Sequence, residues 1–221
     1  MEHRVEILQI TFVTHDVKRF VTTRPEGLRW KPGQGVEVAI AEEGWQDEGR
    51  PFTPTCLADD PVMELTVKEY PDRDGVTERL HRLRPGDELL MSEPFGTITY
   101  RGPGIFLAAG AGVTPFLAIL RNLGEAEELD QCVLHFSNKT PADVLFEKEL
   151  RWLLGDRCHL TCTEKSSPGY DDRRIDRGYL EGEVPDLERT FYLCGPPTFV
   201  DDLRSALREL GVSGDALVFE E

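Results

Sequence analysis

The sequence predicts an α+β protein of two domains, with an antiparallel β-barrel in residues 1–102 and a doubly wound, five-stranded parallel α/β sheet in residues 103–221. Short apolar segments in near-alternation, separated by glycine and proline turns, fill the first half and are typical of a barrel or sandwich. Strands and amphipathic helices alternate in the second half, as in parallel sheets. At its centre, a buried strand, a turn with Gly110 and Gly112, and an apolar-periodic helix follow one another in residues 105–123.

Composition limits the class of protein. The 221 residues are 39% hydrophobic, which is enough to bury a sizeable core. A net charge of −16 argues against nucleic acid or an anionic membrane as a partner. The charged segment 1–6, the lack of a membrane-length apolar run and an odd set of five cysteines predict a cytoplasmic protein with reduced thiols. Cys158 and Cys162 share one face of a predicted strand, but nothing beside them supplies further metal ligands, so no metal site is predicted.

The first half contains the strands of the predicted barrel. Alternating apolar residues predict half-buried strands at 5–12, 20–23, 36–40, 63–68 and 88–91. Turn residues lie between them at 24–27, 31–35 and 42–44. One short helix is predicted from Thr77 to Leu83, so we expect a barrel with a single helix.

The segment Arg50-Pro51-Phe52-Thr53-Pro54-Thr55 is the first candidate site. Prolines at positions 51 and 54 are unsuited to a central strand, so the segment should lie at a sheet edge or line an opening. There the Arg50 guanidinium can bind phosphate, the Phe52 ring offers a flat face and Thr53 offers a hydrogen bond, which suits a flat phosphorylated ligand. An arginine at a strand edge is also commonly a solvated cation.

The start of the short helix, Asp74-Gly75-Val76-Thr77, is the second candidate. Thr77 is predicted to cap the helix and to leave backbone amides for another anion. A threonine cap without a ligand has the same sequence, so the pattern by itself leaves both interpretations.

The second half is predicted to contain five strands and three helices. The strands are 105–109, 131–137, 157–163, 190–194 and 216–219, and the helices are 115–123, 142–154 and 198–210. In such a sheet, ligands bind at the carboxyl ends of the strands, which Gly110, Glu164 and Gly195 follow. Cys194-Gly195-Pro196-Pro197 fits a normal strand-to-helix joint, and equally a small edge against which a ring can lie.

The glycine turn after the first of these strands is the clearest candidate for phosphate. Gly110 and Gly112 permit a sharp turn, Thr114 is predicted to cap the first amides, and Pro115 suits the first helical position. Such a helix start binds phosphate, although a purely structural turn fits the same spacing. Pro115 replaces the third glycine of the dinucleotide fingerprint, and the next strand runs into Ser137-Asn138-Lys139 instead of an acidic residue, which disfavours an ordinary Rossmann dehydrogenase.

Taken in order, the segments resemble the markers of the ferredoxin-NADP reductase superfamily over nearly the whole chain. They are Pro32-Gly33-Gln34, Arg50-Pro51-Phe52-Thr53, Gly75 with Thr77, Pro85-Gly86-Asp87, Glu93-Pro94-Phe95-Gly96, Gly110-Ala111-Gly112-Val113-Thr114-Pro115 and Cys194-Gly195-Pro196-Pro197. The resemblance implies a flavin-binding barrel followed by a nicotinamide-nucleotide domain. Hydride would pass from NAD(P)H to FAD, rather than FMN, at the cleft between them, with little acid or base chemistry required of the protein.

The resemblance also implies roles for individual residues. Arg50 would hold the flavin pyrophosphate, Thr53 would hydrogen-bond the flavin near its hydride-accepting nitrogen, and Cys194 would flank the nicotinamide. The candidate catalytic residues are Thr53, Cys194 and Glu220. The candidate cofactor-binding residues are Arg50, Pro51, Phe52, Thr53, Lys68, Gly75, Val76, Thr77, Gly110, Gly112, Val113, Thr114, Pro115, Glu164, Gly195 and Pro196.

The chain departs from the family pattern in two places. Phe52 stands where the family usually has tyrosine, so a hydroxyl contact is lost while the ring remains. Many members end in an aromatic residue that covers the flavin. Here Phe219 fits a core strand residue, which would leave the flavin face open or covered by the nicotinamide. Glu220 resembles a family carboxylate near the active site and also fits a solvated tail.

The choice of nucleotide depends on the segment after the third strand of the second half. Glu164 would repel a 2′-phosphate and accept a ribose hydroxyl, which favours NADH. Lys165, Arg173 and Arg174 favour NADPH instead. The balance inclines to NADH.

Three functions remain open from the sequence. The first is an electron-transfer reductase that passes single electrons to a flavodoxin, a ferredoxin or an oxygenase component; the sequence has no Cys-x4-Cys-x2-Cys spacing, so that carrier is expected to be another protein. The second is an NAD(P)H:flavin reductase that uses flavin as a substrate. The third is a non-catalytic nucleotide-binding subunit.

An acidic carrier protein would need a basic patch on this protein. The candidates for such a patch are Arg73, Arg79, Arg82, Arg84 and Arg101, although they equally fit scattered surface arginines.

Overall fold

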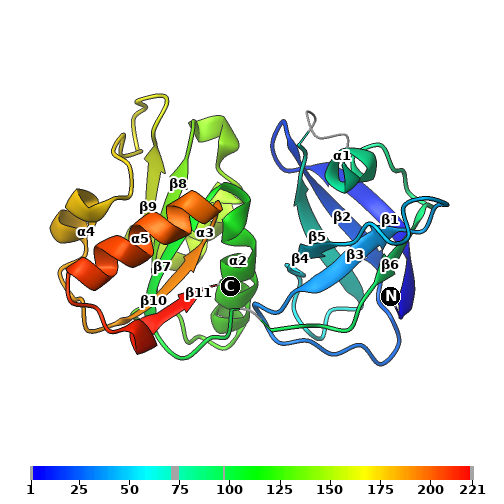
Figure 1. Ribbon diagram of the computed structural model, residues 1–221, viewed down its shortest axis with the longest axis horizontal. Helices are drawn as coiled ribbons and strands as arrows, with labels where there is room; N and C mark the ends of the chain where they lie inside the picture. The colour runs from blue at the N-terminus through cyan, green and yellow to red at the C-terminus, as the bar shows by residue number, and fades with distance from the viewer. Residues whose placement is uncertain (1, 71–74, 97, 220–221) are drawn as a thin grey trace. The chain divides into compact units, whose positions relative to one another are not determined.

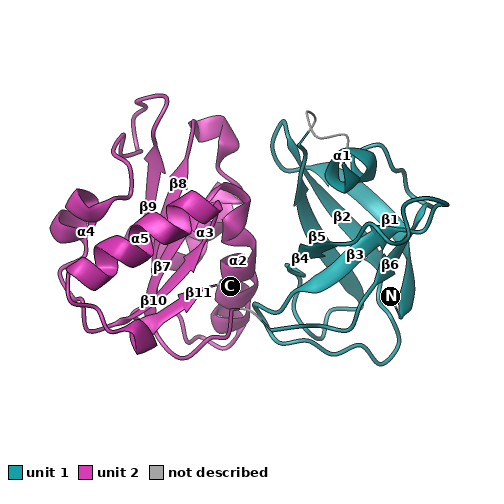
Figure 2. Cartoon of the chain, viewed as in Figure 1, with its two compact units in different colours: residues 1–97 teal, residues 98–221 magenta. Residues whose placement is uncertain are grey.

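The computed structural model describes residues 2–70, 75–96 and 98–219. The chain divides into two compact units, residues 1–97 and residues 98–221 (Figure 2). The sequence places the boundary after Gly102, five residues later. The segment before Gly102 belongs with the second unit because the Tyr100 ring stacks on Tyr192 with centroids 6.0 Å apart, and the Arg101 amide donates to the Tyr192 hydroxyl at 2.8 Å.

The first unit is a six-stranded antiparallel sheet that nearly closes into a barrel (Figure 1). Its strands are β1 (His3–Phe12), β2 (Val17–Thr23), β3 (Val36–Ile40), β4 (Arg50–Phe52), β5 (Val62–Lys68) and β6 (Glu88–Met91), in the spatial order β4-β3-β6-β1-β2-β5. Pro54, just beyond one edge strand, forms an isolated bridge with Leu65 of the other edge strand. The predicted antiparallel barrel is therefore confirmed.

Alternation places one face of these strands in the core. Val5 and Ile7 of β1, and Val36 and Val38 of β3, are fully buried, while the residues between them face outward. The helix α1 (Val76–Leu80) covers part of this core with its buried ends, Val76 and Leu80. It is shorter than the predicted helix from Thr77 to Leu83, because the chain turns after Leu80.

The second unit is a parallel sheet with helices on both faces (Figure 1). Its strands are β7 (Gly104–Ala109), β8 (Val133–Asn138), β9 (Cys158–Cys162), β10 (Thr190–Cys194) and β11 (Leu217–Phe219), in the order β11-β10-β7-β8-β9. Its helices are α2 (Thr114–Glu125), α3 (Glu147–Leu154), α4 (Arg177–Glu183) and α5 (Pro197–Glu209). The predicted doubly wound sheet of five parallel strands is confirmed.

Successive residues of a strand point to opposite faces of the sheet and so pack against different helices. Phe106 of β7 packs edge-on against Phe116 of α2, with ring centroids 5.2 Å apart. The next residue, Leu107, packs with Leu180 of α4 and Leu203 of α5 on the opposite face. The described residues contain no helix long and apolar enough to cross a membrane.

The predicted helix 142–154 is wrong at its start. Residues Pro141–Asp143 form a 3-10 turn, closed by reciprocal hydrogen bonds between Thr140 and Asp143, and α3 begins only at Glu147. Phe146 has a φ of 52°, a left-handed conformation that ends any continuous helix. The helix α4 was not predicted, because its seven residues include two glycines. The signal for its start is Asp176, whose side chain accepts a hydrogen bond from the Tyr179 amide at 2.9 Å.

Both predicted threonine caps are wrong. The N-cap of α1 is Gly75, without a side-chain cap, and Thr77 lies inside the helix. In the second unit a 3-10 turn over Gly110–Val113 precedes α2, so Thr114 is its first residue. The Thr114 hydroxyl donates to the Ala111 carbonyl at 3.0 Å instead of accepting from an amide. Pro115, predicted at the first helical position, is the second residue of α2, because the helix already begins at Thr114.

A buried histidine lies in the core of the second unit. His135 of β8 stacks on His159 of β9 with ring centroids 4.6 Å apart, and its Nδ1 lies 2.9 Å from the Tyr179 hydroxyl. Burial, together with the nearby His159, lowers the pKa of His135 to about 3. His81 in the first unit is shifted in the same direction, because burial lowers its pKa as well.

We expect His135 to make the protein less stable in mild acid. Below pH 6.5 the unfolded histidine binds a proton that the folded one accepts only near pH 3, so stability is present above pH 6.5 and is lost as the pH falls from there. At pH 5 this single group should cost about 2 kcal/mol relative to pH 7. Urea unfolding of the wild type and of His135→Gln at both pH values measures the difference; equal losses in the two proteins would exclude His135 as the cause.

Candidate functional site

The carboxyl ends of β7 and β10 form the switch point of the parallel sheet. From β7 the chain continues to β8 on one side, while β10 pairs on the other side, with Cys194 opposite Ala108. A crevice at this position is where open α/β sheets bind ligands. The loops after β7 and β10 meet there, so the turn with Gly110 and Gly112 and the Cys194-Gly195 joint, predicted separately, lie side by side.

Gly112 is required by the close approach of the two loops. A Cβ on Gly112 would lie 2.5 Å from the Cys194 carbonyl oxygen and 2.6 Å from the Gly195 Cα. A Cβ on Gly195 would in turn lie 2.9 Å from the Phe199 ring and 3.0 Å from the Ala109 Cβ. Because both residues are glycines, the two loops meet backbone to backbone at the switch point, with no side chain between them.

The glycine turn before α2 is the candidate phosphate site. Gly110 has a φ of +53°, which glycine adopts readily, and the chain then turns into the helix through Val113 and Thr114. No side chain caps the first amides of α2, since the Thr114 hydroxyl donates to a carbonyl. The Thr114 amide donates to the Ala111 carbonyl and Pro115 has no N–H, so an anion such as a nucleotide pyrophosphate would bind at the preceding turn, Gly110–Val113.

Glu164 is paired with a lysine that the sequence analysis did not single out. The loops after β8 and β9 are joined by two backbone bonds, from the Thr163 amide to the Asn138 carbonyl at 3.0 Å and from the Glu164 amide to the Lys139 carbonyl at 2.8 Å. The Lys139 Nζ lies 3.4 Å from the Glu164 Oε1, and both side chains are exposed. Spacing does not signal this pair, because its members are 25 residues apart in the chain.

Lys165, Arg173 and Arg174, the cations that favour NADPH, are not equally available to bind a 2′-phosphate. Arg173 binds both carboxylate oxygens of Asp171 and also contacts the Glu183 Oε1 at 2.7 Å. Bonds to these carboxylates raise the pKa of Arg173 and lower that of Asp171. Lys165 and Arg174 are exposed. Arg173 is thus engaged by Asp171 of its own loop and by Glu183 of α4.

Residues Arg50, Pro51 and Phe52 form the edge strand β4, as the prolines predict. The Arg50 side chain is half exposed, its Nη1 donates to the Gly49 carbonyl at 2.6 Å, and its Nη2 lies 3.7 Å from the Glu48 Oε2. A guanidinium has five N–H donors, so capacity remains for a bidentate bond to phosphate. Phe52 is half buried and packs against the barrel core, which leaves only part of its ring for a ligand.

Other candidate residues of the first unit have different surroundings. The Lys68 Nζ binds the Asp16 Oδ2 at 2.7 Å. Burial would raise the pKa of Asp16, but the bond to Lys68 and its charge lower it below the usual value. Gly75, Val76 and Thr77 lie at the start of α1. The roles of these residues, and of Thr53, stay predictions.

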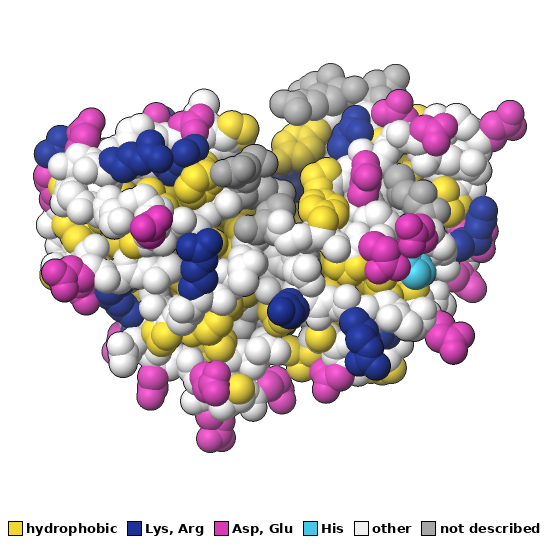
Figure 3. Space-filling view, turned by 60° about the horizontal axis from the view of Figure 1, so that its bottom comes forward, with side chains coloured by type: hydrophobic (Ala, Val, Ile, Leu, Met, Phe, Trp, Pro, Cys, Tyr) yellow, Lys and Arg dark blue, Asp and Glu magenta, His cyan; other side chains and the backbone are white. Residues whose placement is uncertain are grey.

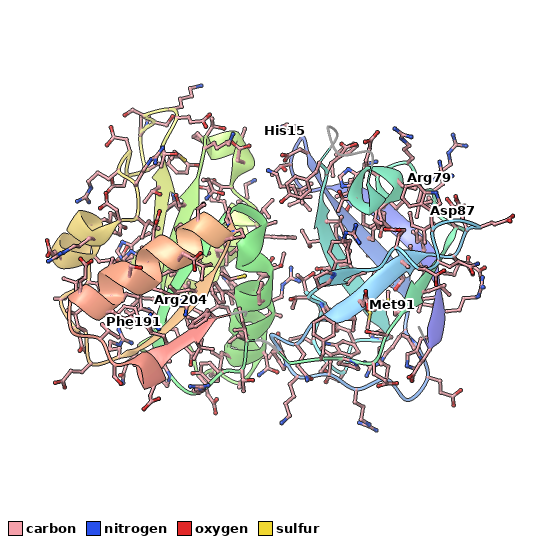
Figure 4. All side chains as sticks on the ribbon, viewed as in Figure 1. His15, Arg79, Asp87, Met91, Phe191 and Arg204 are labelled. Carbon is pink, nitrogen blue, oxygen red and sulfur yellow. The ribbon has the colours of Figure 1, made fainter. Side chains whose placement is uncertain are left out.

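Two further candidates lie at the end of the chain and at the switch point. Phe219 belongs to β11 and packs against the core of the second unit, with the Arg204 guanidinium 3.9 Å from its ring centroid (Arg204 is labelled in Figure 4). It is therefore a core strand residue. Glu220 lies outside the described residues. Cys194 is buried at the end of β10, and its role beside a nicotinamide stays a prediction.

Of the arginines proposed as a basic patch, Arg79 and Arg82 form ion pairs, while Arg84 is exposed. Arg79, labelled in Figure 4, lies on α1 and contacts the Glu42 Oε2 at 2.5 Å. Arg82 pairs with Glu78 one turn earlier. The Arg101 side chain donates to the Asp215 carbonyl at 3.3 Å in the second unit, and Arg73 lies outside the described residues. On the face drawn in Figure 3, acidic and basic side chains are interspersed.

Family models match both halves of the chain. Residues 4–100 match the oxidoreductase FAD-binding domain, and residues 106–205 match the oxidoreductase NAD-binding domain. A ferredoxin NADP+ reductase from Neisseria gonorrhoeae, solved with bound FAD and NADP, shares the fold. Its TM-score is 0.87 at 20% identity, over 99% of this chain and 97% of that chain.

Similar proteins of longer sequence include two reductase components. The propane 2-monooxygenase reductase component of Rhodococcus jostii (strain RHA1) is 27% identical over 99% of this chain and 63% of its own length. The glycine betaine monooxygenase reductase subunit of Chromohalobacter salexigens is 30% identical over 95% of this chain and 61% of its own length. The chain thus spans less than two thirds of either relative. Its fold and its two domain matches show that it belongs to the ferredoxin-NADP reductase superfamily of oxidoreductases, with an FAD-binding domain followed by an NAD-binding domain.

Proposed function

We propose that the protein is an FAD-dependent NAD(P)H oxidoreductase that passes electrons singly to a separate carrier protein. The observation that carries this proposal is the presence of both cofactor-binding domains, in this order, on one chain. When bound, FAD accepts a hydride from NAD(P)H and releases the two electrons one at a time. The carrier is a flavodoxin, a ferredoxin or an oxygenase component, which is consistent with relatives named as reductase components of monooxygenases.

The residues of this chain would mainly bind and orient the two cofactors. The Arg50 guanidinium would bind the flavin pyrophosphate, while Thr53 would place a hydroxyl near the flavin ring. The glycine turn Gly110–Val113, which precedes α2, would bind the nucleotide pyrophosphate. Gly112 and Gly195 keep side chains away from the switch point, so a flat ring can lie against backbone there. None of these binding and orienting roles requires a general acid or base.

The first experiment is a visible spectrum of the gel-filtered protein, followed by anaerobic addition of NADH and, separately, NADPH. We expect a bound-flavin spectrum that bleaches on addition of nucleotide. A protein that stays colourless after soaking with FAD and with FMN would exclude the roles given to Arg50 and Thr53. A nucleotide-binding subunit without catalysis would then be the better hypothesis.

An NAD(P)H:flavin reductase, with flavin as a diffusing substrate, is the second candidate. Glu48 favours it, because its carboxylate lies 3.7 Å from the guanidinium that would bind the flavin pyrophosphate. Phe52 favours it as well, since it has no hydroxyl with which to hold the flavin. Loss of flavin during gel filtration, with flavin-dependent NAD(P)H oxidation restored by added FAD, would identify this function.

We propose NADH as the preferred nucleotide, and Glu164 as the residue that discriminates. Glu164→Gln should raise the ratio of NADPH to NADH kcat/KM about tenfold, because it removes a repulsive charge and releases Lys139 to bind a 2′-phosphate. The matched control is Glu188→Gln, which makes the same charge change just before the amino end of β10. An equal ratio in both variants would mean that Glu164 does not contact the nucleotide.

A further inference from the structure

A tryptophan is exposed on the second unit. Trp152 lies on α3 with 82% of its surface exposed, far more than the other tryptophans of the chain. The buried residues Leu150 and Leu154 face the sheet, so Trp152 points away from it. A large aromatic side chain gains free energy when a partner covers it, and tryptophan is enriched at the centres of protein interfaces.

The segments next to this tryptophan carry exposed carboxylates. The helices α2 and α3 run parallel, and Arg121 of α2 binds Glu149 of α3 through two bonds of 2.6 and 2.9 Å. One turn further along, Leu153 lies against Gly124. Exposed acidic residues follow there: Glu125, Glu127 and Glu128 at the end of α2, and Asp156 just after α3. We call Trp152 with these four carboxylates the Trp152 surface.

Two of the local arrangements are unfavourable within the chain itself. The carboxyl end of a helix carries partial negative charge and favours cations, yet α2 ends in glutamates and has no basic residue in its last turn. Glu127 has a φ of 56°, where glycine is the usual residue and a side chain costs about 1 kcal/mol. Three nearby arginines are engaged elsewhere: Arg121 with Glu149, Arg151 with Glu147, and Arg157 with the Leu129 and Cys132 carbonyls. Lys148, exposed one turn before Trp152, is the basic side chain on the same face of α3.

We propose that the Trp152 surface is a docking site for a basic protein segment that presents arginine or lysine. A cationic side chain can lie over the indole ring while its neighbours pair with the carboxylates, and it would offset the unfavourable negative charge at the end of α2. Anionic membranes and nucleic acids are repelled by the same charges, and a second copy of the surface would repel the first. The helices α2 and α3 run from the carboxyl ends of the strands back to the amino ends, so the Trp152 surface lies at the amino edge of the sheet. The predicted nucleotide site lies at the opposite edge, and docking therefore leaves it accessible.

A labelled peptide of alternating arginine and glycine tests the proposal by fluorescence anisotropy with the full chain at low ionic strength. Trp152→Ala should weaken binding about tenfold, whereas Trp152→Phe should retain most of it, because the ring face remains. Glu127→Gln/Glu128→Gln should weaken binding by a similar factor and flatten its salt dependence. The reduction of the protein by NAD(P)H should be unchanged in all of these variants.

A matched control separates this surface from the overall charge of −16. Glu6→Gln/Glu26→Gln changes the net charge equally at two exposed glutamates of the first unit and should leave binding within about twofold. The proposal is wrong if both double variants weaken binding equally, or if Trp152→Ala binds like the wild type. Sedimentation of the chain alone provides a third test: a dimer that Trp152→Ala dissociates would make this surface a contact between copies instead.

Discussion

Gly112→Ala is expected to destabilise the second unit by about 2 to 4 kcal/mol and to slow reduction by NAD(P)H at least tenfold. The new Cβ would lie 2.5 Å from the Cys194 carbonyl oxygen and 2.6 Å from the Gly195 Cα, so backbone must move. Because both loops belong to the switch point, the movement displaces the glycine turn and the Cys194-Gly195 joint that we assign to the nucleotide. Urea unfolding measures the first effect and anaerobic stopped-flow bleaching the second.

Gly182→Ala is the matched control for this substitution. A Cβ there meets no atom within 4 Å, and Gly182 lies within α4, so alanine should be neutral or stabilising by about 0.5 to 1 kcal/mol. If Gly112→Ala were as stable as the wild type and were reduced at the same rate, the close approach of the two loops would have no part in nucleotide binding.

Arg50→Ala is expected to weaken FAD binding about 100-fold. A bidentate, charge-assisted pair with a phosphate is worth about 2 to 4 kcal/mol, and Arg50 is the candidate for that pair in the first unit. The stability of the flavin-free protein should change little, because the side chain is half exposed and its ion pair with Glu48 spans 3.7 Å. Quenching of FAD fluorescence on titration with flavin-free protein gives the dissociation constant.

Glu48→Gln is the variant that should act in the opposite direction. It removes the competing carboxylate and keeps the guanidinium, so FAD binding should become a few-fold tighter. An Arg50→Ala protein that binds FAD within threefold of the wild type would remove Arg50 from the flavin site. Tighter binding in Glu48→Gln would further indicate that Glu48 lowers the affinity for flavin, as expected of a reductase that uses flavin as a diffusing substrate.

The sequence by itself determined the two-domain architecture. Alternating residues such as Val5 and Ile7 specify half-buried strands, and the strand-helix alternation of the second half specifies a parallel sheet, because period and burial are local properties of the chain. The position of β4 at a sheet edge also followed from Pro51, since proline cannot donate a ladder hydrogen bond. The family followed from motifs in order.

Helix starts were less predictable. Thr77 and Thr114 have the residue type of a cap, but each lies inside its helix, because Val76 is buried against the barrel core and a 3-10 turn precedes α2. The helix predicted from residue 142 starts at Glu147 for a similar reason, since the left-handed Phe146 separates it from the preceding turn. Tertiary packing decides such boundaries over local preference.

Only the tertiary structure decided which distant residues meet. Gly112 touches the Cys194-Gly195 backbone, Glu164 pairs with Lys139, and the end of α2 lies beside α3 near Trp152, although the partners are 25 to more than 80 residues apart. These contacts depend on strand order and helix direction, which bring separate loops to the same edge of the sheet. A local pattern specifies the elements, whereas the site and the exposed surface follow from how the elements are assembled.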